Sequence, residues 1–141
     1  MAYAYEQPVM FGHTDPAGIV FYPRYFEMLN ATIETWFEAM GFSFATLLGP
    51  MGVGVPTAAT EATFHAPSRL GERLSFTLTV ERVGRTSLGL ALRAECGGER
   101  RLSAKATLVC VAVATGRPVP WPEPLRAALV GEGEGAPDHS S

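Results

Sequence analysis

The chain has 141 residues, of which 47% are apolar and 18% are charged, and its formal net charge is −3. This length suits one globular domain, the composition excludes an intrinsically disordered chain, and the acidic balance argues against a nucleic-acid partner. Two cysteines, Cys96 and Cys110, are too few for a disulfide scaffold or a four-ligand zinc site, so we expect no metal. With no signal peptide and no apolar run of about 20 residues, the sequence predicts a reduced, cytoplasmic protein that is not bound to a membrane.

The N-terminal part of the chain predicts a strand, a loop and a long helix. Large apolar side chains in residues 3–13 share one parity, as in a strand. Residues 13–18 contain an Asp-Pro pair and a glycine, which favour a turn. From Pro23 to Met40, apolar side chains recur every three or four residues, which is typical of a helix. Pro23 suits the first helical turn, and Gly41 suits the position just past the end.

The polar side chains of this helix occupy only a narrow part of its circumference. On a helical wheel they share a strip about 100° wide with a few small residues. The strip contains Arg24, Glu27, Ala31, Glu34, Thr35 and Glu38. A helix that is apolar around the rest of its surface is buried on most sides, and a flat sheet would cover only one of them. The sequence therefore predicts a sheet that curls around the helix.

The remainder of the chain predicts strands. After an expected loop at residues 43–54, the apolar pattern changes to a period of two. This alternation predicts four strands, at residues 55–66, 74–81, 87–94 and 102–114. Gly84 and the Gly97-Gly98 pair mark tight turns between the last three strands, which must then be antiparallel. Residues 131–141 are rich in Gly and Glu and predict a disordered tail, so the expected domain covers residues 1–130.

This order of elements predicts an α+β hotdog fold, in which one long helix is wrapped by a curved antiparallel sheet of about five strands. Such a sheet has exposed edges, and exposed edges favour pairing with another chain. We therefore expect a homodimer with a continuous sheet, and two dimers that pair into a tetramer.

The segment from His13 to Tyr25 is the strongest candidate for a functional site. It places the carboxylate of Asp15 in a loop just before a predicted helix N-terminus, where unpaired backbone N–H groups and the positive end of the helix dipole lie. Such N–H groups suit a developing oxyanion, and a nearby carboxylate can serve as nucleophile or general base. These are the requirements of acyl transfer. The alternative is that Asp15 is only a turn residue before Pro16, and the residues alone leave both open.

Residues 15–25, Asp-Pro-Ala-Gly-Ile-Val-Phe-Tyr-Pro-Arg-Tyr, resemble the signature Asp-x-x-Gly-x-(Val/Ile)-x-Tyr-(Pro/His)-x-Tyr of the 4-hydroxybenzoyl-CoA thioesterase family of hotdog acyl-CoA hydrolases. The resemblance extends over residues 5–130. It implies an acyl-CoA thioesterase in which Asp15 is the catalytic carboxylate and the backbone N–H of Tyr22 polarises the thioester carbonyl. Related hydrolases of the Tol-Pal-associated type have His where this chain has Pro23, so Pro23 implies the branch that acts on aromatic acyl-CoA, such as a hydroxybenzoyl-CoA.

Further residues are expected to contact the substrate, and two of them have a structural alternative. His13 could orient Asp15 or could cap a turn. Asn30 could contact the acyl group or could form a hydrogen bond at the border of the helix. Glu61 could face the active site of a partner subunit. The expected substrate-binding residues are His13, Gly18, Pro23, Asn30 and Glu61.

The phosphates of coenzyme A require cations. In the related family the turn equivalent to residues 83–87 is often rich in Arg and Lys, but here Arg85 is its only cation. Neighbouring arginines are therefore expected to share the phosphates. The expected CoA-binding residues are Arg82, Arg85, Thr86, Ser87, Arg100 and Arg101.

Two other functions remain open at this point. One is a thioesterase for short-chain or fatty acyl-CoA, or for acyl-carrier-protein thioesters. The other is a non-catalytic hotdog protein that binds acyl-CoA. Asp15 argues against the binding protein, because a binder has no need of a carboxylate beside an anionic ligand. Neither hydrolase requires a metal or a redox cofactor.

Overall fold

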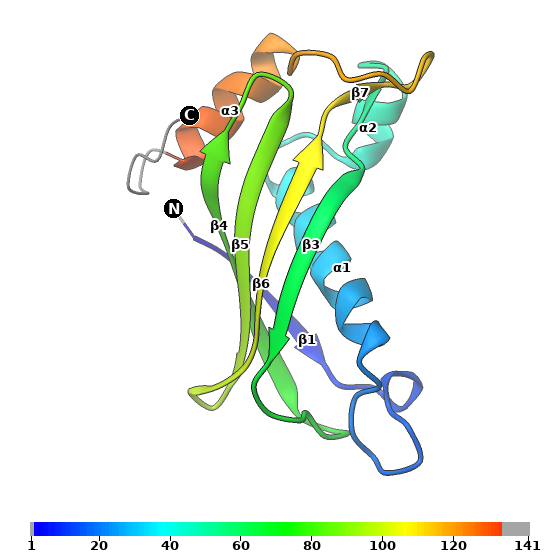
Figure 1. Cartoon of the computed structure of the whole chain (residues 1–141), viewed down its shortest axis with the longest axis vertical. Helices are drawn as coiled ribbons and strands as arrows, with labels where there is room; N and C mark the ends of the chain where they lie inside the picture. The colour runs from blue at the N-terminus through cyan, green and yellow to red at the C-terminus, as the bar shows by residue number, and fades with distance from the viewer. Residues whose placement is uncertain (1, 134–141) are drawn as a thin grey trace.

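The computed structural model describes residues 2–133 and has a five-stranded antiparallel sheet with a long helix on one side (Figure 1). The strands stand in the order β1-β4-β5-β6-β3. Their bounds are Tyr3–Pro8 for β1, Thr57–Phe64 for β3, Arg73–Val83 for β4, Ser87–Cys96 for β5 and Glu99–Val109 for β6. The helix α1 spans Pro23–Ala39. The predicted hotdog architecture and the antiparallel pairing of the strands are confirmed.

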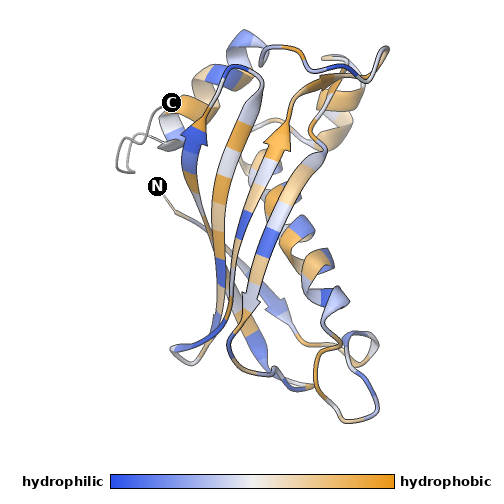
Figure 2. Ribbon diagram, in the orientation of Figure 1, coloured by the Kyte–Doolittle hydropathy of each residue, from blue (hydrophilic) through white to orange (hydrophobic). Residues whose placement is uncertain are grey.

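The alternation of side chains along the strands forms the core. In β4, Leu74, Phe76, Leu78 and Val80 are all buried, and the residues between them are only partly buried. Figure 2 shows the same alternation as bands of opposite hydropathy along the strands. The apolar face of α1 packs into this layer through side chains that include Trp36. Removing such large side chains from water is the main source of stability for a domain of this size.

Helix α1 begins and ends where the sequence predicts. Pro23 occupies the first helical position, where its missing N–H costs no hydrogen bond. At the other end Gly41 has a φ of +93°, which glycine adopts without strain. The amide of Phe42 donates to the carbonyl of Phe37 at 2.9 Å, and the amide of Gly41 donates to that of Glu38 at 3.0 Å. These two bonds form a Schellman motif, which stops the helix.

The strand predicted over residues 3–13 is wrong beyond Pro8. The amide of Val9 leaves the ladder and donates to the carbonyl of Glu72 at 2.7 Å. Residues Phe11–His13 then form a short 3-10 helix, η1. The side chain of Phe11 is 81% exposed, so the shared parity of the apolar residues here did not reflect a common buried face.

Three further short elements differ from the prediction. Two lie in the expected loop at residues 43–54, and the third lies within the strand predicted over residues 102–114, which is interrupted after Val109. A short helix, α2, spans Phe44–Leu48, and the Ser43 hydroxyl accepts a hydrogen bond from the Thr46 amide at its start. Two short strands, β2 (Val53–Gly54) and β7 (Val111–Ala112), pair with each other. These elements contain too few residues to show a clear period.

The C-terminal helix, α3, spans Glu123–Gly133 and packs beside β4 at the upper end of the sheet in Figure 1. It buries Leu125 and Leu129, which are too few to give a strong helical pattern. The expected tail began at Gly131, and this boundary is wrong because residues 131–133 continue α3. The rest of the expected tail, residues 134–141, lies outside the described residues.

Strand β3 forms one edge of the sheet, and most of its residues are exposed. Only β6 pairs with it among the described residues, so its other edge offers unpaired backbone groups. Within residues 2–133, no helix is both long enough and apolar enough to cross a membrane.

Candidate active site

Residues 13–21 form a tight hairpin that leads into α1. The amide of Phe21 donates to the carbonyl of His13 at 2.9 Å, and the amide of Asp15 donates to that of Ile19 at 3.0 Å. The turn closes at Gly18, whose φ of +79° favours glycine and whose amide donates to the Asp15 carbonyl at 2.9 Å. The hairpin therefore places Asp15 at the start of its turn and the beginning of α1 at its base.

The Asp15 carboxylate is held at one oxygen and open at the other. Its Oδ1 accepts a hydrogen bond from the Ala17 amide at 2.9 Å, which is an Asx turn. Within the described chain, Oδ2 accepts no hydrogen bond, and the residue is only partly buried. The carboxylate is therefore oriented by the turn while one oxygen remains available to a substrate or a water molecule.

The start of α1 offers a free backbone donor. Pro23 has no N–H, while the amide of Arg24 donates to the Phe21 carbonyl at 2.9 Å and that of Tyr25 to the Tyr22 carbonyl at 3.1 Å. The amide of Tyr22 donates to no group in the part of the chain that the structure describes. An unpaired N–H at the positive end of a helix dipole is a suitable donor for a carbonyl oxygen that gains negative charge.

Aromatic side chains surround this helix start. The ring of Phe64, at the end of β3, lies 6.0 Å from the ring of Tyr22, 5.5 Å from that of Tyr25 and 6.4 Å from that of Phe26. Tyr25 is buried and belongs to the core, whereas Tyr22 is 60% exposed. The aromatic residues of the 21–26 segment thus divide between core packing and an open surface beside the free amide.

A cavity of about 530 Å³ lies between α1, α2 and the inner faces of β3 and β6. Phe26 and Asn30, one and two turns along α1 from Tyr22, both contribute to its wall. The remaining lining is mainly apolar, with Thr57 and Thr60 of β3 as further polar groups. Phe26 therefore belongs both to this wall and to the aromatic side chains that surround the helix start.

Comparison with known proteins identifies the family. A family model described as the thioesterase-like superfamily matches residues 9–129. The chain belongs to this superfamily. The 1,4-dihydroxy-2-naphthoyl-CoA hydrolase of Thermosynechococcus vestitus is 29% identical over 136 residues, which cover 95% of this chain and 92% of that protein.

Solved structures agree on the fold. A 1,4-dihydroxy-2-naphthoyl-CoA thioesterase from Synechocystis superposes with a TM-score of 0.86 at 22% identity, covering 97% of this chain and 100% of the other. A gentisyl-coenzyme A thioesterase superposes with a TM-score of 0.81 at 24% identity, covering 90% and 99% of the two chains. The expected family, the hotdog fold and the thioester hydrolase class are therefore confirmed.

In this thioesterase, His13 caps a turn. Its Nδ1 accepts a hydrogen bond from the Met10 amide at 2.9 Å, which closes η1, and its carbonyl accepts the Phe21 amide. The acceptor role places the proton of a neutral ring on Nε2. His13 thus supports the hairpin that holds Asp15, which favours the turn-capping alternative.

Asn30 and Glu61 lie on opposite sides of the sheet. Asn30 lines the cavity beside α1. Glu61 pairs in register with Lys105 and, together with Arg93 and Arg100, lines a groove on the other face. Successive residues of a strand point to opposite faces, so in β3 it is Thr60 that points toward the cavity. Thr60 was not among the predicted substrate-binding residues, although the alternation of side chains along this strand indicated that it faces the opposite side from Glu61.

The turn at residues 84–86 and the hairpin of residues 13–21, which carries Asp15, lie at opposite ends of the sheet (Figure 1). Strand β4 starts at Arg73, opposite Pro8, and has 11 residues before the turn, or about 35 Å at the usual rise per residue. Arg85 is exposed in this turn. Within one chain, therefore, the proposed phosphate contacts of Arg82, Arg85, Thr86 and Ser87 lie far from the proposed catalytic carboxylate.

Other contacts secure this turn. The Arg82 guanidinium donates to the Ser87 hydroxyl at 2.9 Å, so these two expected CoA ligands are bonded to each other. The guanidinium of Arg126, from α3, donates to the Gly84 carbonyl at 3.2 Å. Arg126 is a further cation at the turn, and it was not predicted from the sequence because α3 itself was not predicted.

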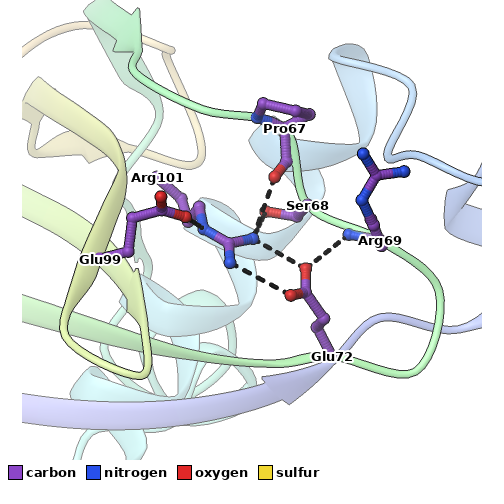
Figure 3. Close-up of polar contacts among 6 residues, drawn as sticks. All are labelled: Pro67, Ser68, Arg69, Glu72, Glu99 and Arg101. Atoms are coloured by element: carbon purple, nitrogen blue, oxygen red, sulfur yellow. Dashed lines mark hydrogen bonds and ion pairs between the residues drawn. The ribbon is translucent and has the colours of Figure 1, made fainter.

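Arg101 is buried, unlike the other expected phosphate ligands. Its guanidinium donates to both carboxylate oxygens of Glu72, at 2.8 and 3.1 Å, and its Nε forms an ion pair with Glu99 at 2.6 Å (Figure 3). Nη1 also donates to the Pro67 carbonyl at 3.0 Å. The guanidinium is occupied by protein groups and only 7% of the residue is exposed, so Arg101 is not available to bind CoA and that prediction is wrong. Arg100, its neighbour, is exposed and stays in that set as a prediction.

The Arg101 pair makes the stability of this thioesterase depend on pH. Hydrogen bonds from the Arg101 side chain and the Arg69 amide lower the pKa of Glu72 from 4.5 to about 2. A carboxyl with a depressed pKa in the folded state contributes stability that is complete above about pH 4.5 and lost as pH falls toward 2. After a discount for its partial exposure, we expect Glu72 to contribute about 2 kcal/mol to the free energy of unfolding.

Glu72→Gln should therefore lower the free energy of unfolding at pH 7 and flatten its decline between pH 4.5 and 2, as measured by urea denaturation at several pH values. Glu27→Gln is a matched control, because Glu27 forms an exposed ion pair with Arg24 at 2.7 Å. Exposed pairs of this kind contribute about 0.5 kcal/mol. If the two variants showed the same pH dependence, the stabilising role of the Glu72 pair would be wrong.

Proposed function

We propose that this thioesterase hydrolyses an aromatic acyl-CoA, with Asp15 as nucleophile or general base. The observation that carries the proposal is the hairpin of residues 13–21. It presents a carboxylate oxygen that has no hydrogen-bond partner among residues 2–133. It also leads to the Tyr22 amide, which is unpaired within the same residues, and into helix α1, which lines a largely apolar cavity. A thioester needs all three: a group that attacks or activates water, a donor for the carbonyl oxygen and a pocket for the acyl group.

The proposed reaction uses these groups in order. The thioester carbonyl accepts a hydrogen bond from the Tyr22 amide, so that negative charge can develop on its oxygen. An Asp15 oxygen then attacks the carbonyl carbon, the C–S bond breaks and CoA leaves as a thiolate; water hydrolyses the resulting mixed anhydride. In the general-base form, Asp15 instead takes a proton from water as that water attacks the same carbon. Both forms release a carboxylic acid and free CoA.

The cavity favours an aromatic acyl group that carries hydroxyl groups. Its wall is largely apolar, which suits a ring, and Asn30, Thr57 and Thr60 can form hydrogen bonds with ring substituents. The curated relative and the solved structures described above act on dihydroxynaphthoyl-CoA and gentisyl-CoA by name. These names and the cavity together support a hydroxylated one- or two-ring acyl group.

Thiol release by the purified chain tests the reaction class. We expect hydrolysis of hydroxybenzoyl-CoA, and slower hydrolysis when the same acyl group is carried by acyl-carrier protein. Faster hydrolysis of the carrier-protein thioester would favour that alternative substrate. Binding of acyl-CoA without any thiol release would favour a non-catalytic binding protein.

We also propose that the active form is a dimer joined at β3. The outer edge of β3 has no partner within the described chain, and antiparallel pairing with a second copy would extend the sheet. Such a two-fold operation turns the second sheet end for end. The 84–86 turn of the partner would then lie at the Asp15 end of the first subunit, so one CoA thioester could contact both subunits.

Light scattering at micromolar concentration tests this assembly. We expect a mass of at least two 15.1 kDa chains, and about four if dimers pair into a tetramer. A stable monomer would contradict the proposal.

The two free cysteines support our proposal that the protein is located in the cytoplasm, where thiols stay reduced.

Arg85→Ala tests whether the turn binds CoA. An exposed guanidinium in contact with a phosphate contributes about 1.5–3 kcal/mol through charge-assisted hydrogen bonds. Because the nucleotide lies far from the reacting carbonyl, its loss should raise KM and leave kcat nearly unchanged, and the penalty should shrink at high salt. A truncated thioester without the nucleotide is the control and should be hydrolysed equally well by both proteins. Equal losses on the two substrates would indicate a structural role for the turn instead.

A further inference from the structure

The buried guanidinium of Arg101 fixes one particular segment of the chain, residues 67–72. Nη1 donates to the Pro67 carbonyl, the Ser68 hydroxyl and the Glu72 carboxylate, at 3.0, 3.3 and 2.8 Å, and Nη2 donates to the second oxygen of Glu72 at 3.1 Å. The same Glu72 carboxylate accepts the Arg69 amide at 2.7 Å. Figure 3 shows that these contacts converge on Arg101 from both ends of the segment.

The 67–72 segment in turn holds the hairpin of residues 13–21. The amide of Val20 donates to the Ser68 carbonyl at 2.8 Å, and the amide of Leu70 donates to the Gly18 carbonyl at 3.0 Å. Ile19 lies between these two bonds and pairs with Arg69 as an isolated antiparallel bridge. One strand of the hairpin is therefore paired with the segment that Arg101 orders.

The other strand of the hairpin carries Asp15. The carbonyl of Ile19 accepts the Asp15 amide at 3.0 Å, and Val20 pairs with Thr14. Tyr22 follows two residues after Val20, so the free amide is set by the same pairing. Three successive sets of hydrogen bonds thus connect the guanidinium to the backbone of Asp15, and two connect it to the strand that leads to Tyr22.

We propose that Arg101 is a positioning residue, which holds the 67–72 segment against the hairpin and so fixes the Asp15 carboxylate and the Tyr22 amide in their reactive arrangement. The inference rests on the proposed function, because it assigns Arg101 a role in that reaction. It also gives a reason for a buried ion pair at a position where well-packed apolar side chains often stabilise a fold equally well. Within residues 2–133, every hydrogen bond of the Arg101 side chain goes to the 67–72 segment, and the side chain also forms an ion pair with Glu99.

Steady-state kinetics and amide exchange on the purified full chain test the inference. The variants are Arg101→Met and the milder Arg101→Lys and Glu72→Gln. Leu129→Ala is the matched control, because Leu129 is fully buried in α3 at the other end of the sheet. Displacing catalytic groups by about 1 Å can cost about 100-fold in rate, so we expect kcat to fall about 10- to 100-fold in Arg101→Met while KM changes less than about threefold.

Arg101→Lys should restore part of kcat, because an ammonium can pair with Glu72 but cannot bridge all its partners at once. Exchange at the amides of Val20 and Leu70 should accelerate in the Arg101 variants and stay slow in the centre of the sheet. The control should lose stability and keep its kcat. An Arg101→Met protein with wild-type kcat, or one that loses no more kcat than Leu129→Ala, would overturn the inference.

The amide readout separates this inference from the proposed function. If the wild-type protein hydrolyses no CoA thioester, the proposed function fails. Unchanged exchange at the Val20 and Leu70 amides in the variants would then also overturn the role of Arg101 in holding the 67–72 segment against the hairpin. If Arg101→Met does not fold, Arg101→Lys and Glu72→Gln carry the same two measurements. Normal kcat and normal exchange in both would overturn the inference.

Discussion

Replacing Asp15 with asparagine is expected to lower kcat by about 10²- to 10⁴-fold, which is the usual loss when a general base or nucleophile is removed. The fold should persist, because the asparagine side-chain oxygen can still accept the hydrogen bond that Asp15 Oδ1 accepts from the Ala17 amide. Asparagine carries an uncharged NH2 group in place of Oδ2, which is the oxygen without a partner in the described chain, and this group can neither attack the thioester nor take a proton from water. Thiol release measures the loss of catalysis, and thermal unfolding of the same variant shows whether the fold persists.

Asp15→Ala is the control for the turn. It removes both the carboxylate and the hydrogen bond to Ala17, so it should lose activity and also some stability of the hairpin. An Asp15→Asn protein that hydrolyses aromatic acyl-CoA at a near wild-type rate would show that Asp15 is only a turn residue before Pro16.

Tyr22→Pro is expected to lower kcat by about 10²- to 10³-fold, the usual cost of removing one oxyanion donor. Proline has no N–H, and Tyr22 has a φ of −54°, which lies within the range of the proline ring. Because the Tyr22 amide donates to no group among residues 2–133, folding loses no hydrogen bond with it. The substitution therefore removes the donor from the reaction while the backbone keeps its shape.

The ring of Tyr22 needs its own control. It contacts the rings of Phe21 and Phe64, so Tyr22→Pro also removes these contacts. Tyr22→Ala removes the ring and keeps the amide, and we expect it to retain most of the wild-type kcat. If the alanine and proline variants were equally active, the amide would have no role in catalysis.

The regular elements of this fold could be predicted because their signals are local. The period of α1, with Pro23 and Gly41 at its ends, gave its bounds to within a residue. The alternation around Phe76 and Leu90 gave two central strands and their inner faces. Short or weakly patterned elements such as α3 were missed, since their stability comes from packing against the sheet rather than from their own sequence.

The arrangement of the site was less predictable, because it depends on contacts that are distant in sequence. Nothing local to Arg101 shows that it is buried against Glu72, so its charge suggested a phosphate contact. The separation of Arg85 from Asp15 could have been predicted in part. Consecutive turns of an antiparallel sheet lie at alternate ends, so the turn after β4, which holds Arg85, lies at the opposite end from the 67–72 segment before β4. That segment pairs with the hairpin that carries Asp15.

The selectivity of thiol release between aromatic and aliphatic acyl-CoA tests the account most directly. The purified wild-type chain would be assayed with 1,4-dihydroxy-2-naphthoyl-CoA, hydroxybenzoyl-CoA, acetyl-CoA and octanoyl-CoA under one set of conditions. Because the cavity joins an apolar wall to polar groups that aliphatic chains leave unpaired, we predict a kcat/KM at least about tenfold higher for the aromatic thioesters. A higher kcat/KM for octanoyl-CoA or acetyl-CoA, or no hydrolysis of either aromatic thioester, would contradict the account.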